Sequence, residues 1–98
     1  MDKSLLEYAN EIVSRVQQSG CRVVIPYAEP SPLTVMYDGS FSCAEYILSY
    51  PATLHIFGMY GHVSVCSIND IRKISSNKYV VNFGNDGQKL DMLVRIED

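Results

Sequence analysis

The sequence contains no tryptophan and only three cysteines, two histidines and four prolines in its 98 residues. Small secreted domains generally pair an even number of cysteines, and no Cys-x-x-Cys spacing is present, so we expect a cytoplasmic protein. The N-terminal residues also lack a basic segment followed by an uninterrupted apolar run, which argues against a signal peptide.

Basic residues are scarce as well, since eight lysines and arginines face eleven acidic residues and give a net charge of -3. The basic cluster that stands out is Arg72, Lys73 and Lys78, and Asp70 lies beside it. Nucleic-acid binders concentrate positive charge on one surface, because neutralisation of phosphates supplies much of their affinity. The sequence therefore argues against nucleic-acid binding.

Motifs for catalysis are missing. The chain has no Gly-x-Gly-x-x-Gly, no phosphate-binding loop and no His-Glu-x-x-His. A catalytic cysteine needs a nearby base and a third group that orients the base, and no such set is visible. We expect no enzymatic activity, no cofactor and no metal.

An amphipathic helix is predicted over residues 5–18. Its apolar residues recur at helical spacing, with polar residues between them. Ser4 and Glu7 have the spacing of a capping box, and Gly20 suits the left-handed conformation that ends many helices. The apolar positions are Leu5, Leu6, Ala9, Ile12, Val13 and Val16.

The next segments predict two strands and a short helix. Residues 21–27 and 33–37 are apolar and β-branched, and Asp38 with Gly39 predicts a turn after the second strand. Ser42 and Glu45 repeat the capping-box spacing, so a helix is expected over residues 43–50.

Two antiparallel hairpins follow in the prediction. A loop from Gly58 to Gly61 places Ile56 opposite Val63, Leu54 opposite Val65, Phe57 opposite His62 and His55 opposite Ser64. A turn at Asp86 and Gly87 pairs three apolar positions, namely Phe83 with Leu90, Val81 with Met92 and Tyr79 with Val94. Residues 69–76 between the hairpins are expected to be irregular, with at most one helical turn.

These elements predict one α+β domain over residues 1–98. The N-terminal helix packs on a mainly antiparallel sheet, and the order is two strands, a short helix and four antiparallel strands as two hairpins. A small, partly open barrel of the last four strands is the alternative.

Residues 46–69 contain no Lys, Arg, Asp or Glu. Pro51, Gly58 and Gly61 argue against a membrane span, because a spanning helix must satisfy its backbone internally. A hairpin with one solvated face should nevertheless carry charges there. We expect this face to be covered, either by the 43–50 helix or by another protein.

The sequence thus predicts a small non-catalytic interaction module, such as an inhibitory, immunity-type or regulatory partner of a larger protein, including a mobile-element product that blocks a host defence enzyme. A second copy is the alternative partner. The residues predicted to bind the partner are His55, Phe57, Met59, Tyr60 and His62.

Other hypotheses compete with protein binding. One is a small-molecule binder or small enzyme with a pocket beside the 29–32 loop, and nucleic-acid binding is the weakest. His55, His62 and Cys66 fall on one face and could together bind zinc, but packing and hydrogen bonding explain these residues more simply.

Overall fold

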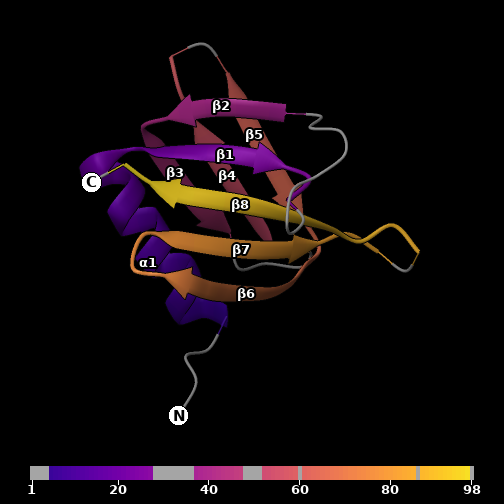
Figure 1. The fold of residues 1–98 in the computed structure, drawn as a ribbon. Coiled ribbons are helices and arrows are strands. Elements are labelled where there is room, and N and C mark those ends of the chain that lie inside the picture. Colours follow the sequence, from indigo (N-terminus) through magenta and orange to yellow (C-terminus); the bar gives the residue numbers. More distant parts are fainter. Residues whose placement is uncertain (1–4, 28–36, 48–51, 60, 86, 98) are drawn as a thin grey trace.

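A computed structural model describes residues 5–27, 37–47, 52–59, 61–85 and 87–97, and for Tyr37 and Asp38 it describes the backbone alone (Figure 1). The chain is α+β, as predicted, with one N-terminal helix and two antiparallel sheets. The five-stranded sheet has the order β2-β1-β8-β7-β6, and the three-stranded sheet has the order β3-β4-β5. The elements are α1 (Leu5–Ser19), β1 (Cys21–Ile25), β2 (Tyr37–Phe41), β3 (Cys43–Ile47), β4 (Thr53–Phe57), β5 (His62–Cys66), β6 (Ile68–Ser75), β7 (Lys78–Phe83) and β8 (Leu90–Ile96).

The two sheets are joined at two corners. Ser42 alone separates β2 from β3, and Ser67, with a φ of 55°, separates β5 from β6. At each corner the chain leaves one sheet and enters the other, so the sheets face each other across a shared core. The described strands pair as two separate sheets and do not form a closed barrel.

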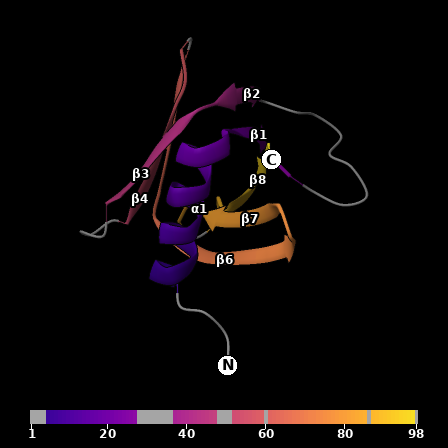
Figure 2. The same cartoon turned by 90° about the vertical axis from the view of Figure 1, so that its left-hand side faces the viewer.

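The helix α1 forms as its periodicity predicts, and it lies between the two sheets (Figure 2). Ala9, Ile12 and Val16 are fully buried against strands of both sheets. Gly20 then ends the helix with a φ of 78°, and its N–H donates to the carbonyl of Val16 at 2.7 Å. Ser4 of the predicted capping box lies outside the described residues.

The core between the sheets is apolar. It combines α1 with the inward positions of both sheets, and burial of each large apolar side chain contributes about 1.5–3 kcal/mol before entropy is subtracted. Its strand residues include Val23, Leu54, Ile56, Val81, Met92 and Val94, all fully buried.

Both hairpin registers are confirmed. On β4 and β5, Ile56 pairs with Val63, Leu54 with Val65, Phe57 with His62 and His55 with Ser64. On β7 and β8, Phe83 pairs with Leu90, Val81 with Met92 and Tyr79 with Val94. The alternation of apolar and polar positions fixes these registers, since a slip by one residue would turn the apolar side chains outward.

The helix predicted over 43–50 is wrong where the structure describes it. Residues Cys43–Ile47 form β3, which pairs with β4 along its length. The backbone N–H of Ser42 donates to the carbonyl of Phe57 at 2.9 Å, so this residue begins a strand pairing and not a helix. Tertiary pairing with β4 overrides the local capping signal.

Two further predictions need correction. Asp38 and Gly39 do not form a turn but pair with Val24 and Val23 inside the sheet. The irregular segment predicted over 69–76 is mostly the strand β6, whose register shifts twice against β7. The strand predicted over 33–37 lies largely outside the described residues, and the first strand ends at Ile25, before Pro26.

No helix in the described ranges is long and apolar enough to cross a membrane.

Candidate functional site

The outward side of the three-stranded sheet carries most of the residues that the sequence analysis selected. Side chains of antiparallel partners point to the same side of a sheet, so the register defines this surface. We call it the β3–β5 face, and its cross-strand rows are Cys43, Phe57 and His62, then Glu45, His55 and Ser64, then Ile47, Thr53 and Cys66.

The inward side of the same strands fixes this orientation. Ala44 on β3, Leu54 and Ile56 on β4, and Val63 and Val65 on β5 are all buried in the core. The residues between them must therefore face away from the core. Of the residues on the β3–β5 face, only Glu45 carries a formal charge at neutral pH.

No described segment covers the β3–β5 face. The helix α1 and the larger sheet both lie on the inner side of β3 and β4 (Figure 2). The helix contacts the edge of β3, where the side-chain amide of Gln17 donates to the carbonyl of Ala44 at 3.0 Å. The covering helix expected over 43–50 is instead an edge strand of this sheet, so it adds residues to the face.

A polar cluster occupies the centre of the face. The Nδ1 atom of His55 lies 2.7 Å from Oγ of Ser64 and 3.2 Å from Nε2 of His62. The same Nε2 atom of His62 lies 2.7 Å from Oγ of Ser64. Three polar atoms from two neighbouring strands thus form a closed triangle at an exposed surface.

Aromatic stacking extends this cluster toward the hairpin tip. The ring of Phe57 stacks on His62 with centroids 4.6 Å apart and an interplanar angle of 14°. It also lies parallel to His55, with centroids 6.0 Å apart and planes inclined by 19°. The three rings therefore form one stacked aromatic cluster across β4 and β5.

A hollow of about 400 Å³ borders this surface and is lined by Ser42, Cys43, Phe57, Gly58 and Met59. Met59 at the hairpin tip is 86% exposed. A Cβ atom on Gly58 would lie 2.9 Å from the carbonyl oxygen of Ser40, so the absence of a side chain lets the hairpin approach the corner at Ser42. The Gly58 N–H closes the hairpin by donating to the Gly61 carbonyl at 2.9 Å.

The structure brings His55, Phe57 and His62 together, and it places Met59 beside them at the hollow. The fifth predicted residue, Tyr60, lies outside the described residues. Ser64 was expected on this face but not as the hydrogen-bond partner of both histidines. Cys43, Glu45 and Ile47 were missed because their segment was predicted to be helical. The alternation of inward Ala44 and Tyr46 with these outward residues is the signal that could have found them.

The zinc site weighed from the sequence is not assembled. In the ranges that the structure describes, no three His, Cys, Asp or Glu side chains lie close enough to hold a metal ion together. Cys66 shares the face with the histidines but belongs to a different cross-strand row.

Ser64 and His55 are also the residue types of a hydrolytic nucleophile and its base. Glu45 is the cross-strand partner of His55, but no described contact joins the two side chains. Ser64 is exposed on a flat sheet surface, where water would compete with any developing oxyanion. Cys21 offers no nucleophile either, since desolvation by burial, with Glu97 nearby, raises the pKa of its thiol to about 12.

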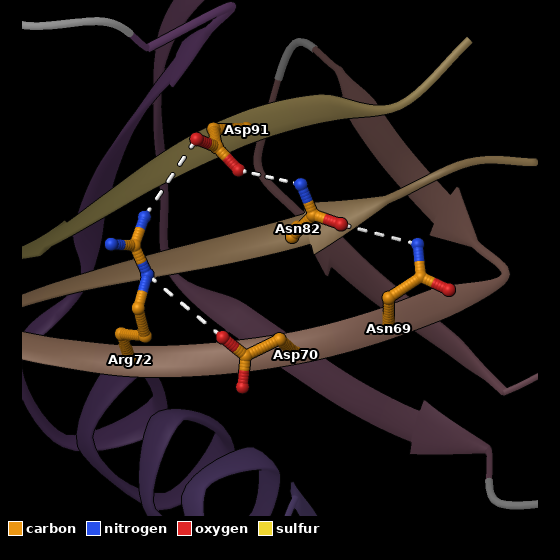
Figure 3. Close-up of polar contacts among 5 residues, drawn as sticks. All are labelled: Asn69, Asp70, Arg72, Asn82 and Asp91. Carbon is orange, nitrogen blue, oxygen red and sulfur yellow. Dashed lines mark hydrogen bonds and ion pairs between the residues drawn. The ribbon is translucent and has the colours of Figure 1, made fainter. Parts of the chain in front are cut away.

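The outward side of the five-stranded sheet is polar by contrast. A chain of contacts crosses β6, β7 and β8 (Figure 3). Asn69 donates to Asn82 at 3.2 Å, Asn82 donates to Asp91 at 2.9 Å, and Arg72 lies 3.7 Å from Asp91. Arg72 also lies 3.9 Å from Asp70. These groups are paired with one another, which is typical of a solvated sheet surface.

The basic residues noted in the sequence are separated by the fold. Arg72 and Lys78 lie on this outer side, whereas Lys73 turns toward α1 and lies 3.4 Å from Glu11. Arg95 and Arg22 join Lys78 in one cross-strand row, which the sequence analysis missed. Asp70, Asp91 and Glu97 accompany these cations, so the surface has mixed charge.

Tyr79 anchors α1 to the larger sheet. Its ring is fully buried, and its hydroxyl donates to Glu11 and accepts from Arg15 at 2.9 Å. Desolvation and the hydrogen bond to Glu11 raise the pKa of Tyr79 to about 12. This cluster holds the helix in place and lies away from the β3–β5 face.

Comparison with known proteins adds no assignment, because no family model, curated protein or solved structure gave a significant match to the chain.

Proposed function

We propose that the protein is a non-catalytic binding module that docks the β3–β5 face on a larger protein, as an inhibitory or regulatory partner. The observation that carries this proposal is a sheet surface that no described segment covers and that has a single formal charge among its described residues. A solvated sheet face normally carries many charged residues. Charge depletion and aromatic enrichment are the features that distinguish the centres of protein interfaces.

Exposed apolar side chains at the β3–β5 face support the same proposal. Met59 is 86% exposed at the tip, and Ile47 is 38% exposed at the far corner of the face. Between them lie the stacked rings of Phe57, His55 and His62. Flat, rigid rings supply contact area at a low cost in conformational entropy, and such residues are common among binding hot spots.

The test is affinity capture of the tagged chain from nuclease-treated lysate of its host. The test variant is Ile47→Ser with Met59→Ser, which removes exposed apolar side chains from this surface. The matched control is Leu6→Ser with Ile74→Ser, because these residues are similarly exposed, at 40% and 41%, on α1 and β6.

We expect one stoichiometric partner that the wild type and the control retain and the test variant loses. Equal retention by both variants would contradict the proposal, as would a monomer that captures nothing. Light scattering of the purified chain distinguishes a foreign partner from a second copy, since only the second copy makes a concentration-dependent dimer.

A second candidate function is small-molecule binding in the hollow beside Met59. Its volume of about 400 Å³ falls within the range of ligand pockets. Ser42 and Cys43 supply its polar groups, and Phe57 supplies an apolar wall. Ligand-observed NMR against a fragment collection tests this candidate, with binding expected to fall in a Met59→Ser variant.

A further inference from the structure

We infer that His55, His62 and Ser64 form a binding site for a divalent transition-metal ion, with zinc as the reference case. The inference concerns the β3–β5 face but does not depend on the protein having a partner. It begins from the triangle formed by Nδ1 of His55, Nε2 of His62 and Oγ of Ser64, with edges of 3.2, 2.7 and 2.7 Å.

Hydrogen bonding can give each of the three polar atoms a partner, but it leaves one of the three contacts without a proton. The serine hydroxyl has one proton, and each ring nitrogen either carries a proton or offers a lone pair. If both facing nitrogens carried protons, their N–H groups would oppose each other. At most two protons therefore serve three contacts, and one contact always lacks a proton of its own. When both facing nitrogens are deprotonated, a cation bound between the three atoms takes one lone pair from each of them.

The separation of the two nitrogens matches chelation of a metal. With metal–nitrogen bonds of about 2.0–2.1 Å, nitrogens 3.2 Å apart subtend about 100–106° at the ion, near the tetrahedral angle. Two imidazoles bound in this way have centroids about 5.0 Å apart. The observed centroid separation is 5.3 Å, so binding requires a ring shift of only a few tenths of an ångström.

The donor set selects the class of ion. Imidazole nitrogen suits Zn²⁺, Ni²⁺ and Cu²⁺, whereas Mg²⁺ and Ca²⁺ prefer oxygen ligands. Glu45 lies directly across from His55 on β3, a position from which its carboxylate can orient a metal-bound imidazole. The remaining coordination positions point toward solvent, so the bound ion is exchangeable and open to further ligands.

This site differs from the one weighed in the sequence analysis, because Ser64 replaces Cys66 as the third group. The sequence placed Ser64 opposite His55, and the structure adds the short distances from Ser64 to both histidines. In the described ranges no Cys, Asp or Glu joins the two histidines as a third ligand, so the site consists of two imidazoles and a hydroxyl. The proposed site therefore differs from structural zinc sites, in which four protein ligands surround the ion.

The experiment is a titration of the purified, chelator-stripped chain with zinc chloride, followed by calorimetry and by ¹⁵N-histidine NMR. The chain has only two histidines, so their four ring nitrogens are individually assignable. Exposed Cys43 and Cys66 can bind zinc by themselves, so the titration is done in a Cys43→Ser, Cys66→Ser background as well as in the wild type.

We expect saturable binding of one ion, with shifts at Nδ1 of His55 and Nε2 of His62 in both backgrounds. His62→Asn and His55→Asn should each weaken zinc binding about tenfold or more, and Ser64→Ala should weaken it less. Magnesium chloride should give no saturable signal. Circular dichroism confirms that each variant is folded. If an asparagine variant is not folded, His55→Gln or His62→Gln at the same position replaces it.

The inference is overturned by either of two results. One is the absence of saturable zinc binding in the Cys43→Ser, Cys66→Ser background. The other is zinc affinity that changes less than about twofold in both histidine variants. Neither result bears on protein docking, so the failure of this inference is distinguishable from failure of the proposed function.

Discussion

His55 and Ser64 lie directly opposite each other on β4 and β5, and their polar atoms are 2.7 Å apart on the side of the sheet that faces away from the core. Hydrogen-bonded side chains in this position usually support a neighbouring element. Here no described element lies above them, and the rings of Phe57 and His62 continue the same exposed surface. The pair is therefore open to contact from outside the chain, as the proposed function requires.

Tyr46→Phe is expected to leave the protein as stable as the wild type or to stabilise it by about 1 kcal/mol. The hydroxyl of Tyr46 is buried and has no hydrogen-bond partner among the described residues, and burial raises its pKa. Removing it ends a desolvation cost without creating a cavity. Urea unfolding measures the difference. A loss of 1 kcal/mol or more would show that the hydroxyl has a partner.

Stability is expected to fall on the alkaline side. The pKa of Cys21 is raised from 9.0 to about 12, and that of Tyr79 from 10.0 to about 12. In both cases the unfolded chain releases its proton first. The stabilising contribution of Cys21 is therefore complete below about pH 9 and that of Tyr79 below about pH 10, and both are lost as pH rises toward 12.

Urea unfolding between pH 8 and about 10.5 tests this linkage. Cys21→Ala should be less stable at every pH but should show a smaller decline between pH 9 and 10. An unchanged slope in that variant would mean that Cys21 is not the group responsible.

Gly58→Ala is expected to destabilise the protein by about 1–3 kcal/mol. The new Cβ would lie 2.9 Å from the backbone oxygen of Ser40, which cannot move without opening the corner at Ser42. Gly87→Ala is the contrasting variant, because a Cβ there meets nothing within 4 Å and only its φ of 80° opposes the change. Thermal unfolding of both variants gives the comparison. A smaller loss for Gly58→Ala than for Gly87→Ala would contradict the steric account.

The sequence predicted those elements in which local pattern and tertiary burial agree. The registers of β4 with β5 and of β7 with β8 follow from strict alternation, because each inward residue meets an apolar partner. The helix α1 follows from apolar spacing that matches its buried face. These regions also supplied His55, Phe57 and His62.

The missed strands are those in which local signals conflict with the fold. Cys43–Ile47 begins with a capping-box spacing, and only pairing with β4 makes it a strand. Asp38 and Gly39 favour turns, but β1 supplies partners for their backbone. The buried residues Ile68 and Ile71 of β6 are three positions apart, because the register shifts between Ile68 and Asp70. This spacing resembles that of a helix and not the alternation of a strand. Glu45 and Ile47 of the β3–β5 face were missed because they lie in the segment that was predicted to be helical.

The most direct test of the central claim is the ¹⁵N-histidine spectrum of the chain with its captured partner, recorded with a chelator present to exclude metal effects. Both histidines of the chain lie on the β3–β5 face, so their ring signals report on that surface alone. We predict that the partner shifts or broadens the signals of His55 and His62, while the side-chain Nε signals of Arg72 and Arg95, recorded from a second sample labelled with ¹⁵N-arginine, stay unchanged. Unperturbed histidine signals in a saturated complex would contradict the claim that this face is the binding surface.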